Sequence, residues 1–266
     1  MKVIAVLPEG LEPIGAEELL DLGAHSVKPQ KRSVSFEADL RSLFRIYLFA
    51  RLPFRLLREV ARFPCDSRQS LYEGVQQSID WSKWLNPAMS FRVDVTGTSS
   101  ALSHSHFTAL QVKNAVVDCQ RDIWGKRSSI NLINPNLRLH LHLYRNTGIL
   151  SLDGSLVSMH KRGYRSAMGI APLKENLASG LIRLTGWNGS IPLIDPLCGS
   201  GSLLLEAANF SLGIPPGINR SFLFQYWHDF DERIWNEEKT FAKKIKQTKH
   251  GHTEIIGCEI DKEIFE

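Results

Sequence analysis

The sequence has few cysteines, no long apolar run and no closely spaced pair of thiols. Its 266 residues include four cysteines that lie far apart, at Cys65, Cys119, Cys198 and Cys258. Because no Cys-x-x-Cys occurs, neither a zinc knuckle nor a disulfide framework is indicated, and a reducing, cytoplasmic setting is expected. No apolar run reaches the ~18 residues that a membrane span needs. The N-terminus becomes acidic too soon for a signal peptide.

Charge is distributed unevenly along the chain. Residues 1–165 hold 22 Lys/Arg against 15 Asp/Glu, a formal charge of +7, whereas residues 166–266 hold 10 against 13, a charge of −3. Such asymmetry indicates a polyanion partner, such as nucleic acid, for the basic half. A solvated helix face with charged strand edges is the alternative. The basic stretch 28–68 supplies three predicted RNA-contacting residues, Arg41, Arg45 and Arg55.

Residues 1–62 alternate between strand and helix patterns. Strands repeat apolar residues with a period of two, and helices repeat them every three or four positions. The expected elements are strands at 3–7, 25–28, 33–37 and 54–63 and helices at 11–22 and 40–49. The order β-α-β-β-α-β predicts a ferredoxin-like domain.

Two further units follow, at residues 63–155 and 156–266. The first is expected to contain helices at 71–79 and 106–124, strands at 91–95, 137–144 and 149–152, and a hairpin turn at 145–148. The second is expected to contain helices at 172–186 and 237–246, a strand, turn and helix at 191–208, and a strand at 254–261. The chain is therefore predicted to combine α/β and α+β structure.

The stretch 191–208, Ile-Pro-Leu-Ile-Asp-Pro-Leu-Cys-Gly-Ser-Gly-Ser-Leu-Leu-Leu-Glu-Ala-Ala, carries the strongest local signal. Cys198, Gly199 and Gly201 form a small-residue turn between strand and helix, which lets a ligand come close to the backbone. In open α/β sheets, ligands bind at this junction. Asp195 suits a cation or an amino group there, rather than a phosphate. A tight connection without a ligand is the alternative, because a lone Gly-x-Gly is a weak signal.

A second acid, Glu259, falls at the end of the next expected strand. An acid at this position can bind the two ribose hydroxyls of an adenosine group. The turn before the helix has neither Gly-x-Gly-x-x-Gly nor a phosphate-binding lysine, which disfavours NAD and ATP. A sulfonium nucleoside with an amino-acid tail fits better, since its amino group would bind Asp195. A plain exposed strand end is the alternative interpretation of Glu259.

Five separated parts of the chain, in order, resemble the THUMP-domain-containing guanine-N(2) RNA methyltransferases, and together they cover nearly the whole sequence. They are Pro8–Glu12 with Leu22–Ala24, Phe91–Thr98 with Gln111–Asp118, Arg162–Arg165 with Ala171–Ala178, Asp195–Ser202, and Gly257–Asp261. The family usually has Thr where this chain has Ser202. The resemblance is greatest to the bacterial enzymes that methylate a guanine of large-subunit ribosomal RNA.

The resemblance implies a fold, a cofactor and a reaction. It implies a ferredoxin-like N-terminal domain, a THUMP RNA-binding domain at 63–155 and the start of a Rossmann-like methyltransferase domain at 156–266. The implied cofactor is S-adenosylmethionine, and its predicted contacts are Asp195, Cys198, Gly199, Gly201 and Glu259, with Pro172 and Leu173 in the element that walls the pocket. The exocyclic amine of a guanine, presented unpaired or flipped, would attack the methyl carbon.

The family's catalytic loop, Asn/Asp-Pro-Pro-Tyr/Phe, has no counterpart in this sequence. The segment 214–217, Ile-Pro-Pro-Gly, has the prolines but neither the amide nor the aromatic ring. The residues from 192 to 266 are roughly half of what a doubly wound domain needs, so a fragment or truncated form without its own catalytic residue is expected. A transfer RNA guanine methyltransferase and a non-catalytic RNA-binding protein are the alternative functions.

Other patterns have simpler interpretations. Three His-x-His pairs, at 104/106, 140/142 and 250/252, lack a third ligand, so no metal site is predicted. The aromatic residues of 222–235 are expected to form a loop packed by its own side chains over the sheet, rather than a base-stacking loop. The basic segment 159–165 adds Lys161, Arg162 and Arg165 to the predicted RNA contacts. No pattern indicates an oligomeric state.

Overall fold

The structure is a computed structural model that describes residues 1–164, 173–248 and 253–261. Its first elements are β1 (Lys2–Val6), α1 (Glu12–Asp21), β2 (His25–Gln30), β3 (Ser33–Glu37), α2 (Leu40–Phe49) and β4 (Arg55–Pro64). The strands are antiparallel in the order β2-β3-β1-β4. This is the β-α-β-β-α-β unit that the hydrophobic pattern predicts, so the ferredoxin-like prediction is confirmed.

The middle elements extend the same sheet. They are α3 (Arg68–Gln77), α4 (Trp81–Trp84), β5 (Ser90–Gly97), α5 (Ser105–Trp124), β6 (Ser129–Ile130), β7 (Leu137–Tyr144) and β8 (Thr147–Asp153). Strand β8 pairs with β4, so one eight-stranded sheet runs in the order β2-β3-β1-β4-β8-β7-β5-β6. The boundary predicted between residues 62 and 63 falls inside β4, and the sheet is continuous across it.

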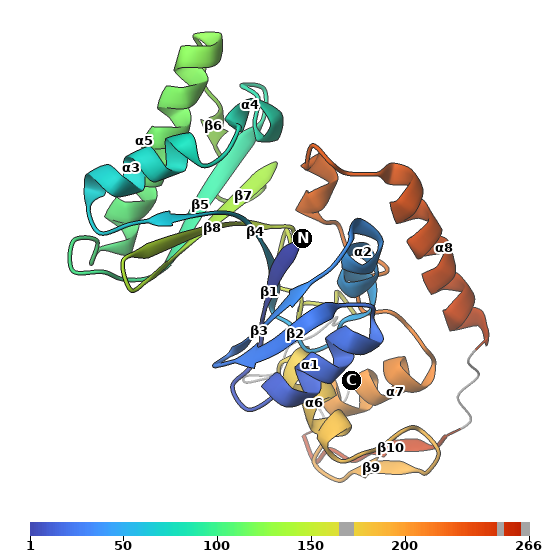
Figure 1. Ribbon diagram of the computed structural model, residues 1–266. Coiled ribbons are helices and arrows are strands. Elements are labelled where there is room, and N and C mark those ends of the chain that lie inside the picture. The colour runs from blue at the N-terminus through green and yellow to red at the C-terminus, as the bar shows by residue number, and fades with distance from the viewer. Residues whose placement is uncertain (165–172, 249–252, 262–266) are drawn as a thin grey trace.

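One face of this sheet forms the core. The strand register places Val3 of β1, Leu152 of β8 and Leu139 of β7 on the same face, and all three side chains are fully buried. Figure 1 shows α1 and α2 against the β1–β3 half of the sheet and α3 and α5 against the β5–β8 half. Because side chains alternate along a strand, the opposite face presents the intervening residues.

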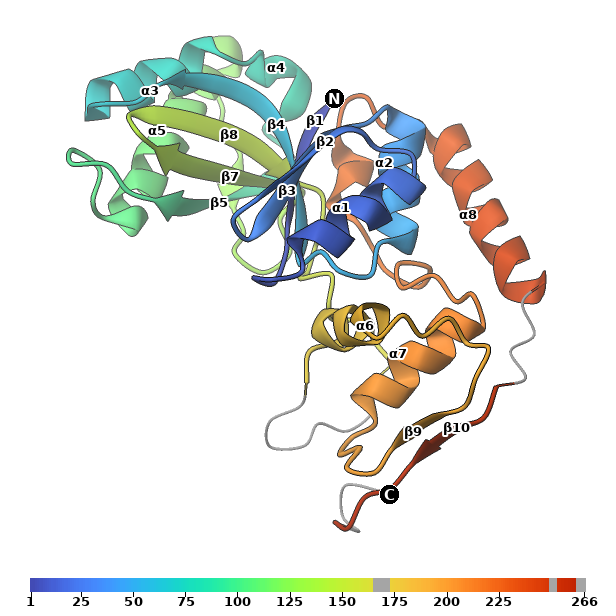
Figure 2. The same ribbon diagram turned by 60° about the horizontal axis from the view of Figure 1, so that its bottom comes forward.

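The last part of the chain is a smaller unit. Its elements are α6 (Glu175–Leu184), β9 (Leu193–Asp195), α7 (Ser202–Ser211), η1 (Leu223–Tyr226), α8 (Glu232–Thr248) and β10 (Ile255–Gly257). Strands β9 and β10 are parallel and α7 packs against both, which is the start of a Rossmann-like fold; η1 and α8 also lie between the two strands in the chain. Figure 2 shows β9 and β10 side by side and α6 next to α7. Within the described ranges, no helix combines the length and apolarity needed to cross a bilayer.

The aromatic segment before α8 packs differently from the prediction. Its rings do contact one another, but they pack on helix α2 rather than over the C-terminal strands. Phe224 stacks on Phe44 of α2 with ring centroids 4.9 Å apart, and Phe222 lies 5.2 Å from the ring of Tyr47. The backbone N–H of Leu223 also donates to the carbonyl of Gly154. The segment therefore fastens the C-terminal part of the chain onto the ferredoxin-like domain.

Replacing Phe224 with alanine should destabilise the protein by about 3–5 kcal/mol, because the ring is fully buried and a cavity would remain. Chemical unfolding followed by circular dichroism would measure the loss. Tyr226→Ala is the matched control, since that side chain is 52% exposed and its removal should change stability by less than about 0.5 kcal/mol. A loss of stability in the Phe224 variant as small as that expected for Tyr226→Ala would show that the aromatic cluster does not stabilise the fold.

Candidate functional site

The turn after β9 is held by backbone hydrogen bonds to β10. The N–H of Cys258 donates to the carbonyl of Asp195, and the N–H of Cys198 donates to the carbonyl of Cys258, both at 2.9 Å. Within the turn, the N–H of Gly201 donates to the carbonyl of Cys198 at 2.8 Å. These bonds fix the end of one strand against the next.

Glycine geometry leaves the outer side of the turn open. Gly199 and Gly201 have φ angles of +52° and +72°, in the left-handed region that favours glycine, and Gly201 is the N-cap of α7. A Cβ at Gly199 would meet no atom within 4 Å. Behind the turn, a Cβ at Gly257 would lie 2.9 Å from the sulfur of Cys198. Cys198 thus packs against β10, while the glycines face solvent.

Glu259 reaches back from the end of β10 to the same turn. Its Oε2 accepts a hydrogen bond from the N–H of Gly199 at 2.7 Å, and its Oε1 accepts one from the N–H of Asp261 at 3.0 Å. The bonds from Asp261 and Gly199 lower the pKa of this carboxyl, so it stays ionised. A carboxylate has about four acceptor sites, so further donors can still bind.

The structure therefore brings together the predicted residues Asp195, Cys198, Gly199, Gly201 and Glu259. Asp195 is half-buried, and its Oδ1 accepts a hydrogen bond from the N–H of Leu197 at 3.1 Å. Leu173 lies two residues before α6. Pro172 lies outside the described residues. Two carboxylates beside open backbone can accept hydrogen bonds from donors such as an amino group or vicinal hydroxyls.

A buried carboxylate lies behind the turn, on helix α7. Glu206 is 1% exposed and accepts hydrogen bonds from the Tyr164 hydroxyl, at 2.8 Å, and from the Ser179 hydroxyl. Two guanidinium groups also face it, with the Nη1 of Arg51 at 3.7 Å and the Nε of Arg162 at 3.5 Å. Burial and then the Glu206 charge raise the pKa of Tyr164, so the hydroxyl keeps its proton and donates.

Arg51 connects this cluster to the ferredoxin-like domain. Its Nη2 donates to the carbonyls of Asn209 and Ile214, at 3.2 and 2.7 Å, and so satisfies acceptors at the end of α7. Its backbone N–H donates to Glu18 of α1 at 3.0 Å. The sequence prediction did not single out these residues. The one available signal was Glu206 itself, an acid inside an apolar helical run.

Several predicted RNA contacts have partners within the protein. Arg41 pairs with Glu237 and Glu238 of α8, and Arg45 pairs with Glu238 at 2.9 Å, so both side chains hold α8 against α2. Arg55 pairs with Asp153 at 2.5 Å on the uncovered face of the large sheet. Their contact with RNA stays a prediction.

The segment 159–165 divides into three cases. Lys161 is exposed and available to a partner. Arg162 is 8% exposed and donates to the backbone carbonyls of Met159 and Arg51. Its guanidinium is enclosed by protein. Arg162 is therefore an interior residue and not an RNA contact. Arg165 lies outside the described residues.

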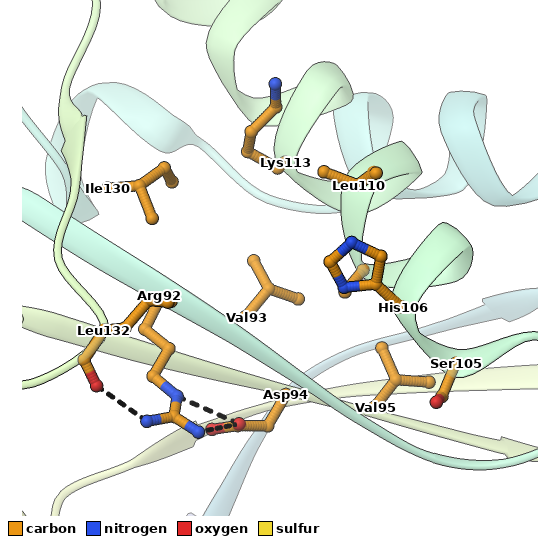
Figure 3. Close-up of a pocket in the computed structure, with 11 residues that line it drawn as sticks. Arg92, Val93, Asp94, Val95, Ser105, His106, Leu110, Lys113, Ile130 and Leu132 are labelled. Atoms are coloured by element: carbon orange, nitrogen blue, oxygen red, sulfur yellow. Dashed lines mark hydrogen bonds and ion pairs between the residues drawn. The ribbon is translucent and has the colours of Figure 1, made fainter.

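A pocket of about 480 Å³ lies between β5 and the start of α5. Figure 3 shows Arg92 and Lys113 on opposite sides of Val93, with Leu110 and Ile130 completing an apolar lining. The guanidinium of Arg92 is fixed by Asp94 and by the carbonyl of Leu132. A pocket with an apolar lining and a cationic rim can accept a base and its phosphate.

The histidines of one pair share a hydroxyl. Thr96 Oγ1 lies 3.1 Å from His140 Nε2 and 3.0 Å from His142 Nδ1. Across residues 1–164, 173–248 and 253–261, no group of three His, Cys, Asp or Glu side chains is placed to hold a metal ion. The pair at 250/252 lies outside the described residues.

Three protein families match consecutive parts of the chain. The RlmL ferredoxin-like domain matches residues 2–57, the THUMP domain matches residues 66–153, and the RMKL-like methyltransferase domain matches residues 162–266.

Individual relatives agree with these matches. The chain is 46% identical over 240 residues to a Synechocystis protein provisionally named an RNA methyltransferase, with 90% of this chain and 62% of that protein covered. It is 40% identical over 266 residues to the ribosomal RNA large subunit methyltransferase K/L of Cellvibrio japonicus, covering 97% of this chain and 35% of the relative. The chain thus spans less than two thirds of either relative.

A solved structure has the same fold over nearly the whole chain. It is a crystal structure of SMU.472, provisionally named a methyltransferase, complexed with SAH. The TM-score is 0.88 at 26% identity, and the similarity covers 99% of this chain and 69% of that one.

Replacing Glu206 with glutamine should loosen α7, because two buried guanidinium groups would lose their carboxylate. Removing one partner of a buried ion pair costs about 3–5 kcal/mol. Hydrogen exchange read by mass spectrometry should show faster exchange of the α7 amides, while the strands of the large sheet stay protected. Glu237→Gln is the control, since its ion pair is partly exposed and its loss should have little effect. Unchanged α7 protection in the Glu206 variant would contradict this role.

Proposed function

Because consecutive parts of the chain match an RlmL ferredoxin-like domain, a THUMP domain and an RMKL-like methyltransferase domain, we propose that it forms the RNA-binding and cofactor-binding part of an S-adenosylmethionine-dependent RNA methyltransferase. The observation that carries the proposal is the hydrogen bond between Glu259 and the N–H of Gly199. It brings the acids of two neighbouring strand ends to one open turn, as a nucleoside with an amino-acid tail requires.

The proposed role of each residue follows from its chemistry. Asp195 binds the amino group of the cofactor tail, and Glu259 binds the ribose hydroxyls. Gly199 and Gly201 keep the backbone accessible, and Cys198 supports the turn from behind. Leu173 and Pro172 are proposed to wall the pocket. When bound, S-adenosylmethionine would supply an electrophilic methyl group.

The proposed substrate is the exocyclic 2-amino group of a guanine in large-subunit ribosomal RNA. The sequence resemblance and the name of the Cellvibrio relative support this choice over transfer RNA. Arg41, Arg45, Arg55, Lys161 and Arg165 remain proposed RNA contacts. An enzyme acting on ribosomal RNA would work in the cytoplasm, which is the proposed location. No residue is proposed to accept the amine's hydrogen, because the sequence has no Asn/Asp-Pro-Pro-aromatic tetrapeptide.

Asp195→Asn should weaken S-adenosylmethionine binding by about tenfold to a hundredfold, since a hydrogen bond to a charged group contributes roughly 1.5–3 kcal/mol. Isothermal titration calorimetry on the chain would measure the affinity. Glu259→Gln should weaken binding as well, while its amide oxygen can still accept from Gly199. Asp122→Asn, an exposed acid on α5, is the control and should bind as the wild type does. Unchanged affinity in both site variants would refute the site assignment.

Loss of the gene should remove one methyl group from a guanine of large-subunit ribosomal RNA. Mass mapping of ribosomal and transfer RNA from cells with and without the gene would locate the change. Complementation with the Asp195→Asn variant should fail to restore the methyl group. A change confined to transfer RNA would favour the alternative substrate. No change in either RNA would favour a non-catalytic RNA-binding protein.

A further inference from the structure

The large sheet has a second face on which α1, α2, α3 and α5 do not pack. Strand register places Ile4 opposite Leu57, Arg62 opposite Ile149, and Ile149 opposite His142 on this face. These are the residues that alternate with the buried core positions. The face therefore continues from the ferredoxin-like half of the sheet into the second half, across a register shift in β4 between Glu59 and Ala61.

A groove of about 940 Å³ runs along this face. Its lining residues come from β2, β3, β1, β4, β8, β7 and β5 and from the turn between β2 and β3. Neighbouring strands are about 4.8 Å apart, so seven strands span about 29 Å, which is long enough for several nucleotides. Ile4, Leu57 and Ile149 make part of its floor apolar.

The charge of the groove favours a polyanion. Against Asp94 and Asp153, it is lined by six basic residues: Lys2, Lys31, Arg32, Arg55, Arg62 and Arg138. Arg138 donates to Asp94 at 2.6 Å, which fixes its guanidinium deep in the groove. Lys31 lies at one end of the groove; its side chain is 81% exposed and its Nζ lies 4.0 Å from Glu9 Oε1. Arg62 of β4 is 45% exposed and pairs with Glu59 at 2.9 Å.

Flat side chains lie beside this basic surface. Tyr144 is 55% exposed, and its ring is nearly parallel to that of His142, at 10° with centroids 6.5 Å apart. Burial lowers the pKa of His142, and it lowers the pKa of His140 to about 4. At neutral pH these histidines therefore act as uncharged, hydrogen-bonding rings. The hydroxyl of Thr96 lies between them.

We propose that this groove binds an unpaired segment of the RNA, with phosphates along Lys31 and Arg62 and bases against His142 and Tyr144. Aromatic rings stack on base faces, which a single strand exposes and a duplex conceals. The proposal rests on the proposed function, since it takes RNA to be the substrate. Beyond that function, the proposal locates the unpaired part of the RNA in this groove before the target base reaches the cofactor site.

Fluorescence anisotropy can test the groove with the whole chain and two labelled probes, a single-stranded oligouridine and a blunt RNA duplex of the same length. We expect the single strand to bind more tightly. Tyr144→Ala should weaken its binding about fivefold to a hundredfold, and Tyr144→Phe should restore it. Replacing both Lys31 and Arg62 with alanine should reduce the salt slope by about 1.4, or roughly 0.7 for each lost phosphate contact.

Matched controls lie elsewhere on the surface. Tyr226→Ala removes an aromatic ring of similar exposure, and the Arg233→Ala, Lys243→Ala double variant removes the same charges from exposed positions on α8. Both should bind the single strand as the wild type does. S-adenosylmethionine affinity is measured on every variant as well. It reports on the fold and on the proposed cofactor site, independently of RNA binding.

The outcomes separate the two proposals. Weaker single-strand binding in the groove variants, with normal S-adenosylmethionine affinity, supports the groove. Equal binding of all variants, or tighter binding of the duplex than of the single strand, overturns it and leaves the proposed methyltransferase function standing. Normal RNA binding by a chain that does not bind S-adenosylmethionine would count against the proposed function and not against the groove.

Discussion

The buried Glu206 carboxylate sets the position of α7, the helix that follows the turn after β9. A charge with 1% exposure is costly unless it is fully paired, and here two guanidinium groups and two hydroxyls face it. Those partners come from three other parts of the chain, namely the loop after α2, the segment before α6, and α6 itself. The turn at Gly199 to Gly201 is therefore placed relative to the ferredoxin-like domain by electrostatics as well as by packing.

Local patterns predicted the regular elements well. The bounds of β3, α2 and β7 agree with the sequence prediction residue for residue, because each has a clear hydrophobic period. The strand, turn and helix at β9 and α7 were also predictable, since a strand-ending acid, two glycines and an apolar helix lie within 18 residues of each other. Glu259 could be paired with that turn because the carboxyl ends of adjacent parallel strands meet at one edge.

Features that depend on distant partners were not predictable from local sequence. Counting basic residues identified Arg41 and Arg45, but their acidic partner, Glu238, lies more than 190 residues away on α8. The aromatic segment gave no sign that α2 would be its packing surface. The uncovered sheet face was missed because its residues come from seven strands, and only the register shows that they share a face.

Strand β4 has consequences for how the protein unfolds and flexes. It pairs with β1 on one side and β8 on the other, so its hydrogen bonds join the ferredoxin-like and THUMP halves into one sheet. Separating the halves would expose two unpaired strand edges. The two halves are therefore expected to unfold together, as a single cooperative unit. A hinge between them is equally disfavoured. A partner that lies along the sheet would thus meet both halves as one paired surface and not as two separate domains.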